Sequence, residues 1–573
     1  MSTGFHSIFQ SGSSTAGSAA LLGALFHQAV RNVEFELYMY HFMALSSVAY
    51  FGLIYALIQL EGQSVSGAFW RSSIFATSFN TTVLLSIALY RLFFHRCRNF
   101  PGPLPAKISR FYAAYLSAKN VQYYKELARV HEEYGDFVRT GPREISVLRK
   151  SAVPLIYGPN SEMRKSTWYG QTGNDLKKTS IHMTRDHESH KQRRRAWDRG
   201  FSMKALATYE PRIKTKADAF MRQLRQSTKP FDASAWSMFY SFDVMGEVGL
   251  GKDFNNLTSG EEHPAIKGVH DHMTMLGILS TVPWLLNVLS SIPGAAAGYS
   301  SFFHFCSSEI QAKNKTWDSE KYPQDIISWL LKAVKDKDVS ASPSPEALED
   351  DTRVVIIAGR YVTCYLWKSH PNKLHSETTA TTLAGALYYL AKCPEKQRKL
   401  QRLLDQTIEG NNAWTYEKVK SVTYIDDWIS ETLRLRPALL TGGPRETPSR
   451  GTQIDEVFIP GNTNVLVPVS LIHRDPRWWQ DAEEFVPERF GEKRAEMGTD
   501  EAPYLPFSLG AYSCPGKNLA QLSLRIALST IVQNFDISFA PGETGEEFDK
   551  EVLDTFTVTL PPLQLNFQPR EHS

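Results

Sequence analysis

The chain of 573 residues is long enough for several domains, or for one large domain behind a membrane leader. Its 63 basic and 60 acidic residues leave a formal charge of +3, which excludes the strongly basic surface that nucleic-acid binding requires. The cysteines show no paired spacing, so neither a disulfide framework nor a zinc site is indicated. They are Cys97, Cys306, Cys364, Cys393 and Cys514. We therefore expect a reducing compartment, no nucleic-acid partner and an apolar small-molecule partner.

The first hundred residues have the composition of a membrane anchor. Residues 37–60 are long and apolar enough to span a bilayer, with His41 as their only awkward side chain. Residues 73–94 are a second, weaker candidate because they carry Asn80 and Arg91. One, two or three spans remain open. A cleaved signal peptide is the alternative, although the first thirty residues lack its basic start.

A basic and proline-rich stretch, "HRCRNFPGPLP", follows these candidate spans. Arg96 and Arg98 lie next to the expected membrane, which favours a cytosolic position for everything after them. Three prolines then interrupt helix formation and make a hinge. We expect residues 1–100 to be the membrane anchor and residues 101–573 to be one catalytic domain.

The region after the hinge is predicted to be mainly α with a small β-sheet region. Long segments with helical spacing of apolar residues dominate it, and strand-like pieces such as "QIDEVFIP" and "NVLVPVSL" are short. The amphipathic segments are 116–135, 203–227, 386–406 and 517–535. The apolar stretch 275–293 is interrupted by Pro283 and is either core or a patch at the lipid surface.

The stretch "PFSLGAYSCPGKNL" has the strongest chemical character. Phe507, Gly510, Cys514 and Gly516 stand at the spacing F-x-x-G-x-x-x-C-x-G before an amphipathic helix. A lone cysteine is ordinarily a packed small hydrophobe. Here, glycines on both sides let the backbone fold around the sulfur and direct N–H groups at it, and the dipole of the following helix stabilises negative charge. The pattern therefore favours a thiolate that faces a metal.

This loop resembles the haem-ligand loop of the cytochrome P-450 family, and further family motifs follow the expected order. "ETLR" supplies Glu431 and Arg434 on one helix face, and "FVPERF" supplies Arg489. By itself, E-x-x-R is most often an ordinary surface pair. The resemblance implies instead that these three residues form a buried ion network behind the haem, in a P-450 fold preceded by transmembrane helices.

The resemblance also assigns residues to the haem propionates. "SHKQRRRAWDRGFS" is similar to the helix at the haem edge, with His190 and Arg194 facing a propionate. A solvated face is the alternative for this basic run, and we expect it for Arg193 and Arg195. "GGPRETP" resembles the strand whose arginine, here Arg445, binds a propionate.

One position departs from the family pattern. Tyr512 stands two residues before the cysteine, where the family usually has arginine or histidine. A phenol can donate a hydrogen bond but cannot form the ion pair, so haem retention is expected to depend more on Arg194 and Arg445. The effect of Tyr512 on haem affinity remains open.

The resemblance implies a haem b whose iron is bound by the Cys514 thiolate, a ligand that favours cleavage of the O–O bond. It implies a monooxygenase at the endoplasmic reticulum membrane, with its catalytic domain in the cytosol and electrons from NADPH through a flavoprotein reductase. The fungal style of the motifs favours secondary-metabolite biosynthesis, with xenobiotic or fatty-chain hydroxylation as an alternative. A haem-thiolate isomerase or dehydratase would need no external electrons, and an inactive membrane protein is a third possibility.

The family's proton-delivery motif, A-G-x-(D/E)-T, is divided in this sequence. Ala358 and Gly359 supply its first half and Glu377 and Thr378 its second, but residues 360–376 stand where one residue is expected. If the helix continued through the excess, the second half would turn by about 160° and move roughly 24 Å along the axis. The inserted segment must therefore loop out or be absent from the active protein.

A retained intron explains the extra residues. Codons for residues 360–362 can contain GTATGT, those for 371–372 can contain the branch-like CTAAC, and those for 375–376 can end in an acceptor AG. Splicing between them would remove sixteen whole codons in frame and leave serine or arginine before Glu377. Pro371 inside the segment opposes a continuous helix. A genuine loop remains the alternative, because synonymous codons need not contain these signals.

Overall fold

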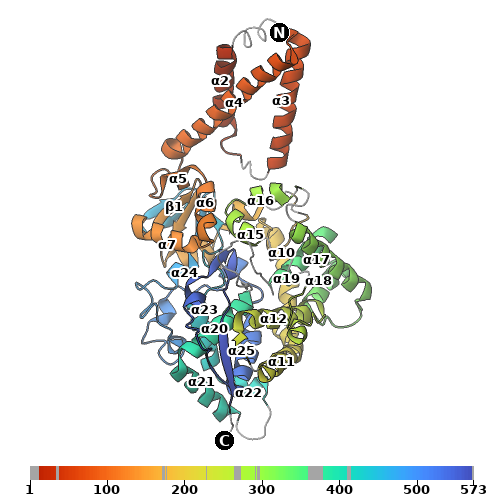
Figure 1. Ribbon diagram of the computed structural model, residues 1–573, viewed down its shortest axis with the longest axis vertical. Coiled ribbons are helices and arrows are strands. Elements are labelled where there is room, and N and C mark those ends of the chain that lie inside the picture. Colours follow the sequence, from red (N-terminus) through yellow and green to blue (C-terminus); the bar gives the residue numbers. More distant parts are fainter. Residues whose placement is uncertain are drawn as a thin grey trace.

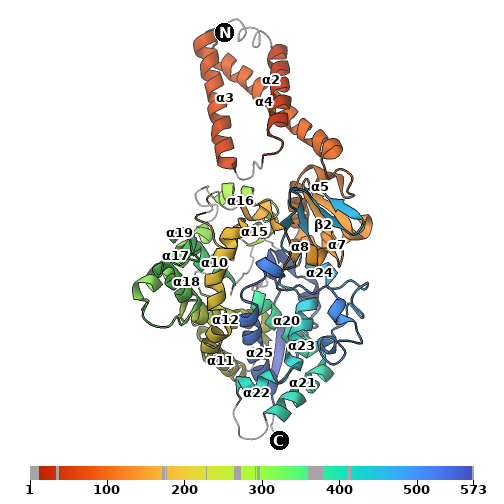
Figure 2. The same cartoon turned by 180° about the vertical axis from the view of Figure 1, so that it is seen from behind.

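The computed structural model describes residues 12–33, 38–170, 175, 177–227, 229–263, 273–290, 292, 297–358, 378–408 and 414–570. The described chain is mainly helical with small sheets, which confirms the predicted fold class (Figure 1). Helices near the N-terminus project from one end of a larger helical body, and the view from behind shows the same arrangement (Figure 2).

The projecting unit contains three long helices. These are α2 (Gly12–Val30), α3 (Met39–Glu61) and α4 (Val65–Leu89), which a π-helical turn, η2 (Tyr90–Phe94), continues. Residues 39–61 and 65–94 are each long and apolar enough to cross a membrane, and most of their surface is not covered by protein. Asn80 donates a hydrogen bond to the Ala76 carbonyl of its own helix at 2.8 Å, so its amide has a partner within the helix.

The larger body is built from many helices of different lengths. Its long helices are α11 (Met203–Gln226), α17 (Ala297–Thr316), α20 (Thr378–Lys392) and α25 (Lys517–Asn534). Those of ten to fourteen residues are α6 (Phe111–Asn120), α7 (Tyr123–Tyr134), α10 (His187–Gly200), α12 (Ala233–Met245), α18 (Ile326–Lys335), α19 (Pro345–Ala358), α21 (Pro394–Thr407) and α23 (Tyr424–Leu435). Short ones are α5 (Leu104–Ile108), α8 (Ala152–Tyr157), α9 (Thr167–Gly170), α13 (Asn256–Ser259), α15 (Met273–Leu279), α16 (Pro283–Ser290), α22 (Tyr416–Lys420), α24 (Val469–Ile472) and α26 (Glu546–Lys550), with the turns η3 (Gly246–Leu250), η4 (Pro487–Phe490), η5 (Thr499–Glu501) and η6 (Gly510–Tyr512).

The sheets lie beside this helical core. One has the order β1 (Phe137–Gly141), β2 (Glu144–Val147), β8 (Asn464–Leu466), β5 (Arg445–Glu446), β3 (Arg164–Lys165). Another has the order β4 (Phe231–Asp232), β12 (Gln564–Pro569), β9 (Phe535–Phe539), and two hairpins pair β6 (Thr452–Ile454) with β7 (Val457–Ile459) and β10 (Leu553–Thr555) with β11 (Thr557–Thr559). Antiparallel pairing of β3 and β5 places Lys165 directly opposite Arg445.

The core centres on α20, which packs against α12, α23 and α25. Every residue of α20 from 380 to 391 is buried, so this helix has no solvated face over those three turns. The helix α25, which starts just after Cys514, is also largely buried. The position of the cysteine loop is therefore tied to the most tightly packed part of the protein.

The helices α19 and α20 both pack against α12. On the α19 side, Val355 faces the η3 turn that continues α12, where a Cβ at Gly249 would lie 2.9 Å from the valine methyl. The expected helix interruption at 360–376 lies outside the described residues, as do Gly359 and Glu377.

Several segments that the helical periodicity predicts as continuous are divided into two helices in the structure. The expected segment 116–135 is divided at Val121, which has φ of 57° and ends α6 in the left-handed region. The segment 386–406 is divided between Lys392 and Pro394, because a proline starts a new helix more readily than it continues one. In 275–293, Pro283 begins α16. Tyr40 of α3 donates to the Asn287 carbonyl at 2.7 Å, so α16 lies at the end of the body that bears the N-terminal helices.

Candidate active site

Cys514 lies on a tight loop at the amino end of α25. Its backbone N–H donates to the Phe507 carbonyl at 2.9 Å, which closes the loop around the sulfur. Burial raises the pKa of the Cys514 thiol. The backbone N–H groups of Gly516 and Lys517, which face the sulfur, and the charge of Arg194 partly offset this effect. These N–H groups can donate hydrogen bonds to a thiolate.

The Cys514 side chain is exposed, although the surrounding protein raises the pKa of its thiol. The sulfur therefore has surface to which a ligand can bind.

Gly510 is sterically required in this loop. Its φ is +60°, and a Cβ there would lie 2.4 Å from the Gly158 carbonyl oxygen and 2.6 Å from that of Tyr157. Any other residue would have to displace the backbone that follows α8. This close approach explains the glycine at the fourth position of the cysteine motif.

Buried positive charge gathers beside the loop, around Tyr512. Lys165 and Arg445 are both nearly fully buried, and their charged groups lie over the Tyr512 ring at 5.2 and 5.0 Å from its centroid. Burial lowers the pKa of Lys165 well below its usual range, and the charge of Arg445 lowers it further. Among the described residues, the Nε of Arg445 has no hydrogen-bond partner. Two like charges directly opposite on paired strands favour an anionic group between or beside them.

The side chains of the basic helix α10 differ in burial and in their contacts. His190 is buried and its ring lies 4.7 Å from that of Tyr512, while Arg194 donates to the Ser513 carbonyl at 2.7 Å and pairs with Asp198. Arg194 therefore holds the cysteine loop in this structure. Arg195 is exposed, as expected.

The expectation that Arg193 lies on a solvated face is wrong. Its guanidinium is buried, forms an ion pair with Asp351 at 2.7 Å and donates to the Thr179 carbonyl at 2.8 Å. Asp351 lies on α19, 158 positions away in the sequence, and folding brings it close enough to compensate this charge.

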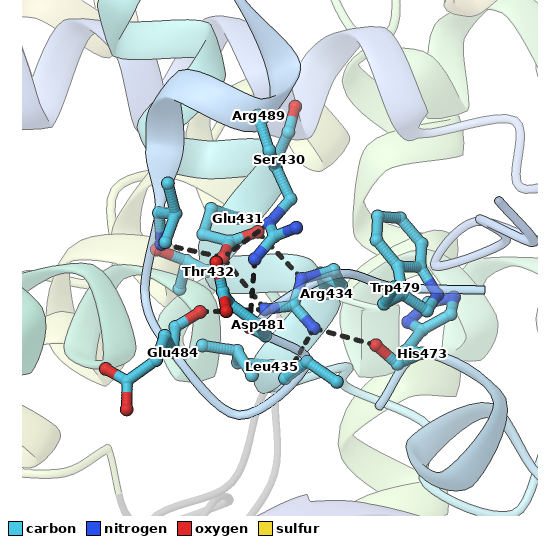
Figure 3. A network of polar contacts seen from close by, with 12 residues as sticks. Ser430, Glu431, Thr432, Arg434, Leu435, His473, Trp479, Asp481, Glu484 and Arg489 are labelled. Atoms are coloured by element: carbon cyan, nitrogen blue, oxygen red, sulfur yellow. Dashed lines mark hydrogen bonds and ion pairs between the residues drawn. The ribbon is translucent and has the colours of Figure 1, made fainter. Parts of the chain in front are cut away.

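The structure brings Glu431, Arg434 and Arg489 into one fully buried network (Figure 3). Glu431 accepts from Arg434 Nε and Nη2, both at 2.8 Å, from Arg489 Nε at 3.1 Å and from the backbone N–H of Val486 at 2.8 Å. The remaining guanidinium N–H groups donate to backbone carbonyls, including those of Ala482 and Gln480. One carboxylate therefore connects α23 with the segment that contains η4.

This network reaches the cysteine loop through His473. Arg434 donates to the His473 carbonyl at 2.8 Å, and the His473 ring accepts the backbone N–H of Leu505 at 3.0 Å. Leu505 in turn accepts from Ser508, at the start of the loop. Burial lowers the pKa of His473 to about 3, so its ring stays neutral and able to accept this bond at neutral pH.

Of the two expected proton-delivery residues, the structure describes one. Thr378 is the first residue of α20 and is half-buried, and its carbonyl accepts the hydroxyl groups of Thr381 and Thr382. Glu377 lies outside the described residues.

A family model for cytochrome P450 matches residues 101–567. The chain belongs to the cytochrome P450 family. This P450 is 37% identical over 489 residues to "Cytochrome P450 monooxygenase orf5" of Eupenicillium brefeldianum, which covers 85% of this chain and 94% of the relative. It is 33% identical over 557 residues to "Cytochrome P450 monooxygenase FCK2" of Fusarium pseudograminearum, covering 96% and 97%. It is 31% identical over 478 residues to "Tryprostatin B 6-hydroxylase" of Aspergillus fumigatus, covering 82% and 81%.

Family and relatives confirm the expected class: the P450 is a haem-dependent monooxygenase, an oxidoreductase that incorporates oxygen from O2, and is of fungal type. Family members use haem and electrons supplied by a reductase. The residues of this chain fit that cofactor. A thiol with backbone donors can bind iron, and the unpaired Arg445 Nε beside Lys165 can bind a carboxylate.

Lys165 was not expected from the sequence. It belongs to no family motif that the sequence displays, and only the register of β3 against β5 places it opposite Arg445. A strand of two residues is too short for alternating polarity to reveal it.

Proposed function

We propose that this P450 inserts one oxygen atom of O2 into an apolar organic substrate in fungal secondary metabolism. The observation that carries the proposal is the Cys514 thiol, which faces the N–H groups of Gly516 and Lys517 and lies just before α25. Fungal relatives support the metabolic setting, and the name of one assigns it the hydroxylation of tryprostatin B.

Haem b, held through Cys514, would supply activation of O2 and transfer of one oxygen atom to carbon. The residues of this chain would hold that group in place. Arg445 and Lys165 would bind its carboxylates, with His190 beside them. Among the described residues Arg445 Nε has no hydrogen-bond partner, and Lys165 Nζ donates to the backbone carbonyls of Ile181 and His182. Arg194 keeps the cysteine loop closed through Ser513. Phe507, Gly510 and Gly516 shape the loop around the sulfur.

Glu377 and Thr378 are proposed to deliver protons on the side of the haem opposite Cys514. A carboxylic acid followed by an alcohol can accept a proton from solvent and pass it through a hydroxyl group. Thr378 is the first residue of α20, whose following turns are buried, so the alcohol lies at the end of a fixed helix. This assignment needs Glu377 to follow Ala358 and Gly359 at the family's spacing.

Electrons are proposed to come from NADPH through a flavoprotein reductase, at the endoplasmic reticulum membrane. Residues 1–100 would anchor the protein in lipid and residues 101–573 would form the cytosolic catalytic domain. Two long apolar helices and the Arg96 and Arg98 flank support this placement.

The central test is the absorbance of the reduced protein with carbon monoxide. The wild-type protein should show a band near about 450 nm, the signature of thiolate ligation. Cys514→Ala should lose that band while Cys393→Ala, at a half-buried cysteine away from the loop, should retain it. A 450 nm band in Cys514→Ala would overturn the assignment. Consumption of NADPH that depends on both substrate and O2 distinguishes a monooxygenase from an isomerase.

We propose that the active protein lacks the sixteen extra residues of the retained-intron segment. Sequencing of the transcript and expression of both forms test this. The short form, with one residue between Gly359 and Glu377, should oxidise substrate, whereas the long form should divert electrons to peroxide. If mature transcripts keep residues 360–376 and the long form couples electrons efficiently to product, the segment is a genuine loop.

A further inference from the structure

The helix α2 has the length of a membrane span but not the hydropathy. Over the described residues, length and hydropathy identify residues 39–61 and 65–94 as spans and omit α2. Its 19 residues would extend about 28 Å, close to the roughly 30 Å of a hydrocarbon core. Among them are small and polar residues, which lower its average hydropathy.

The contacts of α2 with α4 show that the two helices run in the same direction. Going along α2, each contact falls further along α4 and η2. The pairs are Gly12 with Ile74, Ala16 with Ser78, Gly23 with Phe79 and Thr82, His27 with Ser86 and Arg31 with Tyr90. Only parallel helices in a constant register give such a series.

One face of α2 is specialised for this contact. Its buried residues recur every four positions: Thr15, Ala19, Gly23 and His27. A Cβ at Gly23 would lie 2.7 Å from the Phe79 carbonyl oxygen, so the two backbones approach closely because the residue is glycine. Small residues at this spacing are typical of helix pairs within membranes.

Two polar contacts join α2 to α4. His27 Nδ1 and Ser86 Oγ lie 2.7 Å apart, and Ser78 donates to the Ala16 carbonyl at 2.7 Å. Leu21, Leu22 and Leu25 in the middle of α2 are 63%, 48% and 57% exposed, and the exposed polar residues Ser13 and Gln28 lie near its two ends. The middle of the helix therefore presents lipid-compatible side chains outward and pairs the His27 ring inward.

We propose that α2 is a third membrane-spanning helix, packed in parallel on α4, with its amino end on the membrane side opposite the catalytic domain. The end of α4 adjoins that domain, where Arg91 donates to the Ile108 carbonyl at 2.6 Å. A parallel α2 therefore ends on the same side and begins on the other (Figure 1). A leader with only two spans would leave its amino end on the catalytic side. This inference depends on the proposed membrane anchoring.

The orientation can be tested with N-glycosylation acceptors on flexible linkers, inserted one at a time in the full-length chain and expressed with microsomes. Acceptors before Gly12 and at 62–64 should be glycosylated, and one at 31–33 should not. If the 62–64 acceptor is modified and the one before Gly12 is not, the third span is refuted. If the 62–64 acceptor is also unmodified, the anchoring by α3 and α4 fails instead.

The helix pair can be tested by cross-linking cysteines in membranes with a short thiol-specific reagent. His27→Cys with Ser86→Cys should cross-link at least tenfold more than His27→Cys with Leu85→Cys, because Leu85 is 59% exposed on another face of α4. Adding Gly23→Ile should lower the cross-linking of the first pair several-fold. Equal yields from the two pairs would overturn the packing of α2 on α4.

Discussion

The substitution Glu431→Gln removes one negative charge from the interior while it preserves the shape of the side chain. Glu431 accepts four hydrogen bonds, three of them from the guanidinium groups of Arg434 and Arg489 (Figure 3). A glutamine offers a single acceptor oxygen and would turn an NH2 group toward a cation. Both guanidinium groups would then remain buried without a carboxylate.

The size of the effect follows from this burial. Breaking a fully buried ion pair by removing one partner costs about 3–5 kcal/mol, since the remaining charge is no longer compensated. Here Arg434 and Arg489 are both 0% exposed, and water cannot replace the lost partner without opening the packing. We expect a loss in the upper part of that range, or about a thousandfold in the folding equilibrium.

The loss should also be visible at the thiolate. Arg434 holds the His473 carbonyl, and the His473 ring holds the N–H of Leu505 ahead of the cysteine loop. We therefore expect Glu431→Gln to lower both the midpoint of thermal inactivation and the fraction of protein with the 450 nm carbon monoxide band.

The matched control is Glu162→Gln. Glu162 pairs with Arg450 on the surface, where side chains more than half exposed make an ion pair worth at most about 1 kcal/mol. If Glu431→Gln is no more destabilising than Glu162→Gln, the buried network does not hold the fold as argued.

Three further changes have expected outcomes. Gly510→Ala should abolish the 450 nm band because its Cβ would overlap the Gly158 carbonyl. In the control Gly542→Ala, the residue has a φ of 86° but no atom lies within 4 Å of the added Cβ, so the change should cost only about 1–2 kcal/mol of stability. Arg445→Met should lower haem retention, measured as the Soret to protein absorbance ratio, by about tenfold or more, since a charged hydrogen bond contributes about 1.5–3 kcal/mol. Acidification from pH 6.5 to 5 should lower the free energy of unfolding by about 2 kcal/mol through His473, because the ring in the unfolded chain, with pKa 6.5, binds a proton over this range and the ring in the folded protein, with pKa about 3, does not. His473→Gln should reduce this pH dependence in thermal melts.

The parts of the site that the sequence reveals are those whose geometry is local. Glu431 and Arg434 are three residues apart on a helix, so their spacing predicts a shared face, and the glycines around Cys514 predict a tight loop without knowledge of any distant segment. Arg489 joins them only in space, and the order of the motifs pointed to it.

The parts that the sequence conceals depend on register or on distant partners. Lys165 reaches Arg445 because β3 pairs with β5 in one particular alignment. Arg193 stands in a run of basic residues, and its burial depends on Asp351 in α19. Local patterns carry no signal for either, because compensation of a buried charge is a tertiary property.

The two sides of the active site differ in how they respond to the extra residues between α19 and α20. The described contacts that place α20 come from α12, α23 and α25, and those that place the cysteine loop come from α25, Arg194 and the Glu431 network, so all of them are made by residues outside 360–376. The thiolate side can therefore form whether or not residues 360–376 are present. The proposed proton delivery differs, because as proposed it needs Gly359 and Glu377 at a fixed spacing along one axis. It follows that a long form can bind haem and show the 450 nm band while it fails to couple electrons to product, and the two measurements together locate the defect.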